Sequence, residues 1–234
     1  MRLLVSFVIV MSRKVKVHVP VKLKGRREIR GRFARFEATA STADSRVTLP
    51  TRRTPPTTSS TRSSRIGHDD TMEMTPQPPE WTDRAPVKIS ASREIMASPD
   101  EIFAALADHQ SWPQWFSQLT KIESLGELTE GIGSKRRAFV KKVEIDEEFT
   151  AWDPGKVWGF TVVALRGVPP VIESMSERVS IQQLSSDRCR VTYLMALGPR
   201  RRFVWLFDKV LSKGVAKQLS GALAGLDRHL HATE

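Results

Sequence analysis

The sequence predicts an α+β domain in which a curved antiparallel sheet of six to seven strands wraps around one long C-terminal helix. Three observations lead to this prediction. Short segments of alternating apolar and polar residues, separated by turn residues, fill most of the chain between residues 121 and 197. Residues 202–231 carry apolar residues at spacings of three and four, and all six Trp residues and the single Tyr lie after residue 80. Strands joined by short turns form a meander, and this helix is long enough to cover its apolar face.

The first 80 residues differ in composition from the rest of the chain. They carry 16 basic and 7 acidic side chains, whereas residues 81–234 carry 21 and 19. Residues 38–80 contain no aromatic residue and are rich in Thr, Ser, Arg and Pro, so they bury too little apolar surface to offset the entropy cost of ordering. We expect residues 1–80 to be a basic, largely disordered leader. Because most of the excess charge lies there, it does not predict a nucleic-acid partner for the domain.

The origin of this leader has several interpretations. Residues 3–11 resemble the apolar part of a signal peptide but lack a small-residue cleavage site, and the Arg- and Ser-rich composition is typical of a transit peptide. Residues 15–23 alternate as an edge strand or as a locally extended segment. We favour the interpretation that the start of translation is assigned too early. The true start would then lie near Met72 or Met74, just before the composition changes.

Composition excludes several classes of protein. A single cysteine, Cys189, cannot form an internal disulfide or a Cys-rich zinc site. The longest apolar run has nine residues, so we expect no membrane-spanning helix. No set of histidines and carboxylates has metal-ligand spacing, and no phosphate or dinucleotide motif is present. We therefore expect neither a metal nor a cofactor.

The elements follow one another in a regular order from residue 86. A strand over residues 86–96 leads into a helix that begins at Ser98, because Ser98, Pro99 and Glu101 form a capping box with Pro at the first helical position. A second short helix is expected over residues 112–119. The next strands are expected at residues 121–127, 135–142, 143–152, 157–165, 171–184 and 190–197, and the last helix at residues 202–231.

This order and several motifs resemble the SRPBCC superfamily, also called START-like or helix-grip, and within it the polyketide cyclase/dehydrase-like branch. The resemblance rests on the segments at residues 97–103, 106–108, 111–115, 131–133 and 152–155, and it covers residues 86–232. It implies a ligand-binding domain with a deep apolar cavity between the sheet and the long helix. Some members of the superfamily are enzymes and many only bind, so the fold alone does not identify the function.

Two polar residues are the candidates for chemistry in such a cavity. Glu147 shares a strand face with Ile145 and Phe149, where burial would raise its pKa and suit it to general acid–base catalysis. The alternative is that twist or a bulge turns Glu147 to solvent. Tyr193 shares a face with Met195, and its hydroxyl either contacts a ligand or bonds a backbone carbonyl. We expect Glu173 to be solvated and Glu177 to point away from the cavity, with a cavity-facing Glu177 as the alternative.

The remaining predicted pocket residues are large apolar side chains on the inner faces of these elements. They are Trp115, Phe116, Phe139, Ile145, Phe149, Phe160, Met175, Val179, Met195, Phe207 and Leu211. The basic clusters at residues 135–137 and 200–202 are interpreted as solvated faces, with an anionic membrane or ligand as the alternative. His109, between the two short helices, is interpreted as a capping residue.

The function expected from these features is the binding of a small hydrophobic molecule, such as a lipid, polyketide or aromatic metabolite. An enzyme of the cyclase/dehydrase type using Glu147 or Tyr193 is the first alternative, and a toxin-like or regulatory protein is the second. Whether the protein is an enzyme stays open at this stage. We expect a cytoplasmic protein, a monomer or weak homodimer, without stable membrane insertion.

Overall fold

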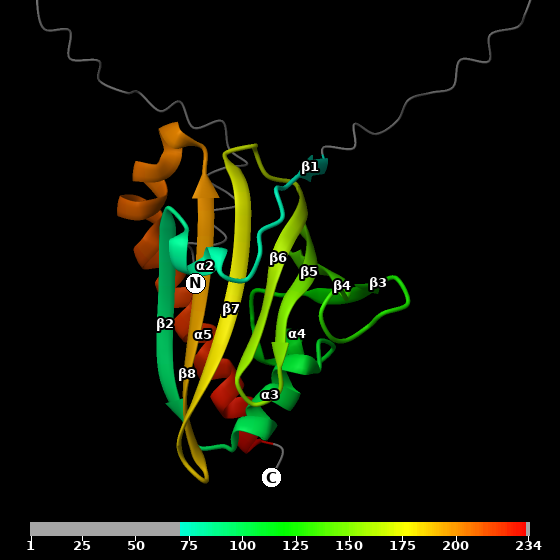
Figure 1. Ribbon diagram of the computed structural model, residues 1–234, viewed down its shortest axis with the longest axis vertical. Helices are drawn as coiled ribbons and strands as arrows, with labels where there is room; N and C mark the ends of the chain where they lie inside the picture. Colours follow the sequence, from blue (N-terminus) through cyan, green and yellow to red (C-terminus); the bar gives the residue numbers. More distant parts are fainter. Residues whose placement is uncertain (1–70, 233–234) are drawn as a thin grey trace, which may run out of the picture. The chain divides into compact units, whose positions relative to one another are not determined.

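The computed structural model describes residues 71–232, which form one antiparallel sheet with helices packed on it (Figure 1). The strands are β1 (Thr71–Glu73), β2 (Val87–Ile95), β3 (Lys121–Leu125), β4 (Lys135–Val140), β5 (Val143–Asp153), β6 (Val157–Arg166), β7 (Ile172–Ser185) and β8 (Arg188–Pro199). The helices are α2 (Trp81–Arg84), α3 (Pro99–Ala107), α4 (Trp112–Trp115), η1 (Arg201–Phe203), the π-helical segment η2 (Leu206–Leu211) and α5 (Ser212–His231).

The sheet has the strand order β2-β8-β7-β6-β5-β4-β3, and β1 adds an eighth strand beside β6. Short turns join β3 through β8 as a meander. Two register shifts in β5, between Asp146 and Glu147 and between Phe149 and Ala151, mark bulges that bend this strand. The resulting curved sheet and the helix lying across it confirm the predicted helix-grip α+β fold.

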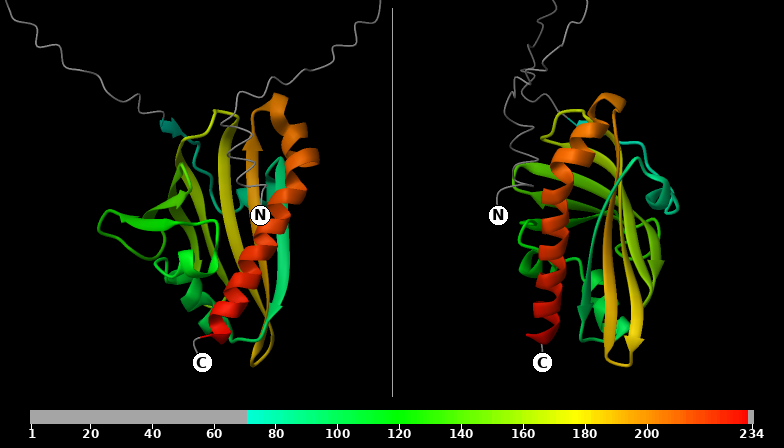
Figure 2. Two further views of the ribbon diagram at one scale, coloured as in Figure 1. Left: turned by 180° about the vertical axis from the view of Figure 1, so that it is seen from behind. Right: turned by 90° about the vertical axis from the view of Figure 1, so that its left-hand side faces the viewer.

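The long helix α5 crosses one face of the sheet, and α2 lies on the opposite side (Figure 2). The inward-facing residues of α5 are buried at intervals of three and four, and they form the predicted apolar stripe: Val215, Leu219, Leu223 and Leu226. The helical region runs without interruption from residue 201 to residue 231, in line with the predicted helix, but it contains the 3₁₀ turn η1 and the π-helical segment η2 before α5.

One glycine fixes the approach of α4 to α5. A Cβ atom at Gly225 would lie 2.0 Å from the carbonyl oxygen of Trp115. Only a residue without a side chain lets the end of α4 pack this closely, so Gly225 sets how α4 covers the sheet edge.

The predicted capping box at the start of α3 is present. Ser98 Oγ accepts a hydrogen bond from the Glu101 backbone N–H at 3.3 Å, and Glu101 Oε2 accepts one from the Ser98 N–H at 2.7 Å. Two of the otherwise unpaired N–H donors at this helix end are therefore satisfied.

Residues 71–80, which the sequence analysis assigned to the leader, belong to the fold. Strands β6 and β7 pair only between residues 157–161 and 176–180, and the segment of residues 71–77 occupies the gap where they diverge. The Met74 N–H donates to the Val163 carbonyl at 2.9 Å and the Thr75 N–H to the Glu173 carbonyl at 2.8 Å. The sequence pattern did not predict this segment as part of the sheet, because the segment has few apolar residues and joins the sheet mainly through backbone hydrogen bonds. The other predictions for residues 1–70 lie outside the described residues.

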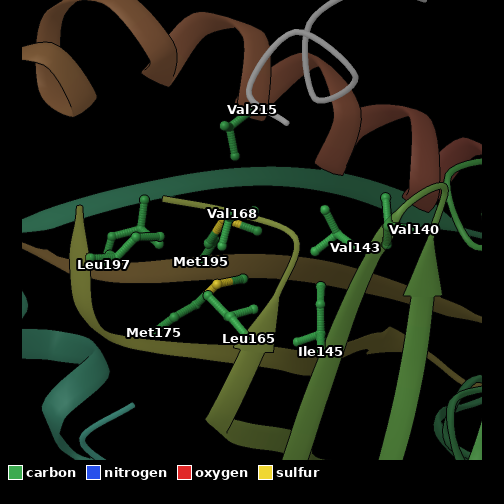
Figure 3. Close-up of a pocket in the computed structure, with 10 residues that line it drawn as sticks. Val140, Val143, Ile145, Leu165, Val168, Met175, Met195, Leu197 and Val215 are labelled. Carbon is green, nitrogen blue, oxygen red and sulfur yellow. The ribbon is translucent and has the colours of Figure 1, made fainter. Parts of the chain in front are cut away.

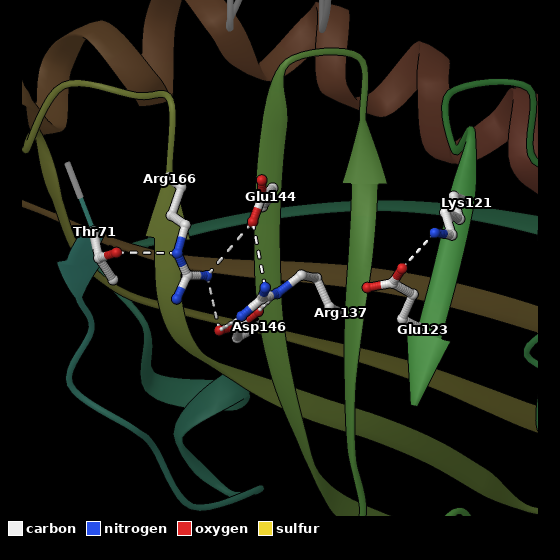
Figure 4. Close-up of polar contacts among 7 residues, drawn as sticks. All are labelled: Thr71, Lys121, Glu123, Arg137, Glu144, Asp146 and Arg166. Carbon is white, nitrogen blue, oxygen red and sulfur yellow. Dashed lines mark hydrogen bonds and ion pairs between the residues drawn. The ribbon is translucent and has the colours of Figure 1, made fainter. Parts of the chain in front are cut away.

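Ion pairs on the outer face tie β1 to β4, β5 and β6 (Figure 4). Arg166 bonds Thr71 Oγ1 at 3.0 Å and Asp146 at 2.9 Å, and Arg137 reaches the same carboxylate at 2.6 Å. Burial would raise the pKa of Asp146, but the hydrogen bonds from Arg137 and Arg166 outweigh it and lower this pKa. These contacts help to hold β1 in the gap beside β6.

Candidate functional site

Two adjoining cavities lie on the inner face of the sheet, the apolar one beneath α5 and the polar one beside α4 and the segment that follows it. The apolar cavity, of about 50 Å³, is drawn in Figure 3, where Val215 reaches from α5 toward side chains of the sheet. It is lined by Val140, Val143, Ile145, Leu165, Val168, Ile172, Met175, Met195, Leu197 and Val215. The polar cavity, of about 60 Å³, is lined by Trp112, Phe116, Gln118, Leu119, Arg136, Val140, Ile145, Glu147, Phe160, Met175, Glu177, Tyr193 and Met195. Four residues line both cavities, so the two lie side by side, and we refer to them together as the ligand site, with a polar end and an apolar end.

A buried ion pair forms one wall of the polar cavity. Arg136 on β4 lies directly opposite Glu147 on β5 in the strand register, and Arg136 Nε donates to Glu147 Oε2 at 2.6 Å. The two residues are only 1% and 4% exposed. Burial raises the pKa of Glu147, and the charge and hydrogen bond of Arg136 oppose that increase. The pair is therefore shielded from water, and each charge depends on the other.

Aromatic rings surround the Arg136 guanidinium. Its Cζ atom lies 4.5 Å from the ring centroid of Trp112, and 5.1–5.4 Å from those of Phe149, Trp158 and Phe160. The negative faces of such rings attract a cation, more strongly where water is excluded. Arg136 Nη1 is buried and has no hydrogen-bond partner among the described residues, so this cation retains an unused donor in the cavity wall.

A second polar pair lies on the neighbouring strands. The Tyr193 hydroxyl on β8 donates a hydrogen bond to Glu177 Oε2 on β7. Burial raises the pKa of Glu177 to about 8, and the nearby Glu147 charge adds to the increase. Burial and the Glu177 charge raise the pKa of Tyr193 well above its ordinary value. At neutral pH, Glu177 is therefore mainly a neutral carboxylic acid that can donate as well as accept a hydrogen bond.

Strand alternation explains why these polar groups meet. Arg136 shares the inner face of β4 with Ala138 and Val140, all of them buried. Glu177 and Tyr193 occupy diagonal positions across the β7–β8 pair, because Glu177 is opposite Met195 and Val179 is opposite Tyr193. Long side chains at diagonal positions of antiparallel strands reach one another.

The structure places the predicted site residues in three groups. Glu147, Tyr193, Phe116 and Phe160 line the polar cavity, and Ile145, Met175 and Met195 line both cavities. Trp115, Phe149, Val179, Phe207 and Leu211 are buried in the core around them. Phe139 lies on the other face of β4, where Lys121 Nζ is 5.6 Å from its ring centroid, because it is an odd number of residues away from both Arg136 and Val140.

Three interpretations of individual polar residues need correction. Glu147 does not face solvent, and Tyr193 bonds the Glu177 carboxylate instead of a backbone carbonyl. Arg136 is no solvated residue of a basic cluster, although the alternation with Ala138 and Val140 was visible in the sequence.

The interpretation of His109 as a capping residue needs correction as well. Its ring stacks on Phe149 at 4.8 Å, and its Nε2 has no partner among the described residues. Burial and the Arg136 charge lower the pKa of His109 to about 3. The ring is therefore a neutral part of the aromatic layer and not a cap.

Within residues 71–232, no group of three or more His, Cys, Asp or Glu side chains is arranged to hold a metal ion. No helix in that part of the chain has both the length and the apolar character needed to cross a membrane.

Comparison with known families agrees with this geometry. Residues 86–231 match the family model described as "Polyketide cyclase / dehydrase and lipid transport". The chain belongs to this family. The match spans the cavities and every residue of the buried polar group, and it leaves residues 71–85 outside.

Individual similar proteins also align with about three fifths of this chain. Uncharacterized proteins of Mycobacterium tuberculosis and Mycobacterium bovis are 27% identical over 146 residues, which are 59% of this chain and 84% of each relative. A START superfamily protein from Mycobacterium smegmatis has a TM-score of 0.50 at 15% identity, covering 63% of this chain and 99% of that one. A Thalictrum norcoclaurine synthase mutant bound to a transition-state analogue has a TM-score of 0.52 at 14% identity, covering 63% and 95%. At these identities the solved structures support the fold alone.

Proposed function

We propose that this protein binds a small, mainly apolar molecule that carries one hydrogen-bond-accepting group. The observation that carries the proposal is Arg136, which lines the polar cavity and whose buried Nη1 has no hydrogen-bond partner among the described residues, beside a second cavity lined only by apolar side chains. A buried donor without a partner costs about 1–3 kcal/mol. A ligand carbonyl, hydroxyl or carboxylate at this end would remove that cost, while the apolar body of the ligand occupies the other end.

Ligand binding requires the two cavities to enlarge. They hold about 50 and 60 Å³, whereas a dry cavity that admits benzene measures roughly 150 Å³. Met175 and Met195 line both cavities, and methionine side chains change rotamer at low cost. We therefore expect these two side chains to move when a ligand joins the cavities.

Native mass spectrometry of the full chain, purified from its own source, tests the proposal. A reproducible added mass of a few hundred daltons is expected. Val215→Phe, which fills the apolar cavity from α5, should abolish the added mass, whereas Val210→Phe on an exposed position of η2 should retain it. A chain that stays unliganded after incubation with lipid and aromatic-metabolite extracts, or a Val215→Phe variant that binds normally, would contradict the proposal.

A cyclase/dehydrase-type enzyme is a second candidate, and one observation favours it. Glu177 stays protonated up to about pH 8 and touches the Tyr193 hydroxyl in the polar cavity, which is the state that a general acid needs at neutral pH. Glu147 suits this role less well because its carboxyl group is already hydrogen-bonded to the Arg136 guanidinium.

Incubating the recovered ligand with the protein tests the enzyme hypothesis. An enzyme converts it, and Glu177→Gln or Tyr193→Phe lowers turnover by about 10²–10⁴ while binding persists. A ligand that the wild-type protein returns unchanged would exclude catalysis on that molecule and leave the binding proposal standing.

A further inference from the structure

One exposed face of the C-terminal helical region combines positive charge with a large aromatic side chain. Every fourth residue from 201 to 217 lies on it, and all five are exposed: Arg201, Trp205, Lys209, Lys213 and Lys217. We call this set the basic–Trp face. The opposite side of the same region packs into the core through Phe207, Leu211 and Val215. The π-helical turn η2, with more residues per turn than an α-helix, helps to keep this four-residue spacing in line.

The charge of this region is largely uncompensated. Residues 200–217 contain six basic residues and one acidic residue, Asp208. Lys209 pairs with Asp208 at 2.8 Å and Arg200 pairs with Glu173 at 3.5 Å. The structure gives no ion pair with a described residue to the other four, so the face presents a positive field to solvent.

Apolar surface lies among these charges. Trp205 is 68% exposed and Val210 is 49% exposed. Isolated exposed apolar side chains are common on protein surfaces, but a Trp and a Val exposed together among basic residues are typical of surfaces that meet lipid. Tryptophan in particular favours the boundary between headgroups and acyl chains.

The basic–Trp face lies at the apolar end of the ligand site. The segment η2 and the loop between β6 and β7 lie at the same end of the sheet in both views (Figures 1 and 2). Val168 on that loop and Val215, two residues after Lys213, both line the apolar cavity. A partner bound to this face would therefore lie next to the apolar cavity.

We propose that the basic–Trp face docks on an anionic lipid surface, with Trp205 and Val210 at headgroup depth and the lysines on lipid phosphates. Each basic residue near such a surface strengthens binding by roughly fivefold. The attachment is peripheral, because α5 keeps its apolar side on the sheet. A nucleic acid would bind the lysines through its phosphates and stack a base on Trp205, but it offers no apolar environment to Val210, whereas the headgroup–acyl boundary of a membrane accommodates both side chains.

The experiment must report on this face and not on the basic residues 1–80. An environment-sensitive fluorophore is attached to the full chain through Val210→Cys, since the native Cys189 is buried and unreactive by comparison. A second labelled variant, Ile132→Cys, places the fluorophore on an exposed turn away from the face. Both are titrated with vesicles of phosphatidylcholine alone and of phosphatidylcholine with phosphatidylglycerol.

The expected result is a blue shift at position 210 with anionic vesicles only, and none at position 132. Adding Lys209→Glu and Lys213→Glu should weaken the response at least about tenfold. Reversing the exposed Lys156 and Arg188, which lie at the opposite end of the sheet, should change it less than twofold. Binding of the chain to vesicles without a shift at position 210 would overturn the proposal. So would a shift produced by RNA but not by vesicles, which would assign the face to nucleic acid.

Discussion

At the residue scale, Arg136 and Glu147 depend on each other because neither charge can reach water. Arg136→Met leaves the Glu147 carboxylate buried without its partner, and we expect the free energy of unfolding to fall by about 3–5 kcal/mol. The double variant Arg136→Met with Glu147→Leu removes both charges and should recover most of this loss. Urea unfolding near pH 7 measures both values. A double variant as unstable as the single one would show that the cation is needed for packing against its aromatic rings and not for charge balance.

Glu177 makes stability depend on pH. In the unfolded chain this carboxyl ionises near 4.5, whereas in the folded chain its pKa is about 8. Between these values the folded state holds a proton that the unfolded state has released. This residue alone therefore lowers the free energy of unfolding by about 1.4 kcal/mol per pH unit as the pH rises, and the decrease ends above about pH 8.

Replacing Glu177 with Gln removes that dependence. The stability advantage of Glu177→Gln over the wild type should grow steadily from about pH 5 to pH 8. Chemical denaturation across this range is the measurement, with Glu173→Gln on the exposed part of β7 as the control. Parallel stability curves for the wild type and Glu177→Gln would mean that Glu177 ionises at an ordinary pKa in the folded protein.

Single residues of the site were only partly predictable. Alternation along one strand placed Glu147 and Tyr193 on inner faces, and the same rule applied to residues 135–140 would have placed Arg136 there. Because Arg136 lies between two other basic residues in the sequence, all three were interpreted as one solvated cluster. The pairing of Tyr193 with Glu177 was not readable, because it depends on the register between two strands, which turns and bulges determine.

At the scale of elements, the segment of residues 71–77 closes the gap between β6 and β7. Met74 is 5% exposed and belongs to the core, while Met72 is partly buried and lies two residues earlier. Met74→Ala should lower the free energy of unfolding by about 2–5 kcal/mol, as expected for a buried methionine, and Met72→Ala should cost less. Hydrogen exchange of the amides in β6 and β7 should accelerate more in the first variant. Equal, small effects would mean that the segment packs only loosely in the gap.

Two glycines of α5 form a matched pair for testing how α4 is seated. A Cβ atom at Gly225 would lie 2.0 Å from the Trp115 carbonyl oxygen, whereas a Cβ atom at Gly221 meets nothing within 4 Å. Gly225→Ala should displace α4, lower the melting temperature and change the near-ultraviolet signal of Trp112 and Trp115. Gly221→Ala should stabilise the protein by up to about 1 kcal/mol through helix propensity. A stabilising Gly225→Ala would show that α4 moves aside without cost.

Elements with strong periodicity were predicted well, and the exceptions have physical causes. The capping box identified the start of α3 because it is a local pattern of side chains. Strand β1 was missed because three residues carry no usable periodicity and pair with a partner more than 90 positions away. The π-helical turn η2 was also missed, since its apolar spacing of four fits an α-helix equally well.

At the scale of the whole molecule, the ligand site has a direction. Its polar end, at Arg136 and Glu177, lies beside α4, and its apolar end lies beneath Val168 and Val215, next to the basic–Trp face. A molecule that passes from a lipid surface through this end would enter with its polar group leading and reach the Arg136 donor last. The two proposals together therefore predict that docking speeds ligand exchange without changing affinity, because surface charge acts mainly on encounter rates.

Ligand transfer from vesicles measures this coupling. Once the native ligand is identified, its movement from anionic vesicles to the full chain is followed by stopped-flow quenching of the protein's tryptophans. Lys209→Glu with Lys213→Glu should slow transfer at least about tenfold and leave the dissociation constant in vesicle-free buffer within twofold of the wild type. High salt should slow the wild type toward the variant, because screening shortens the range of the attraction. Transfer at the same rate in both proteins would separate the two activities, and the basic–Trp face would then serve only to locate the protein on a membrane.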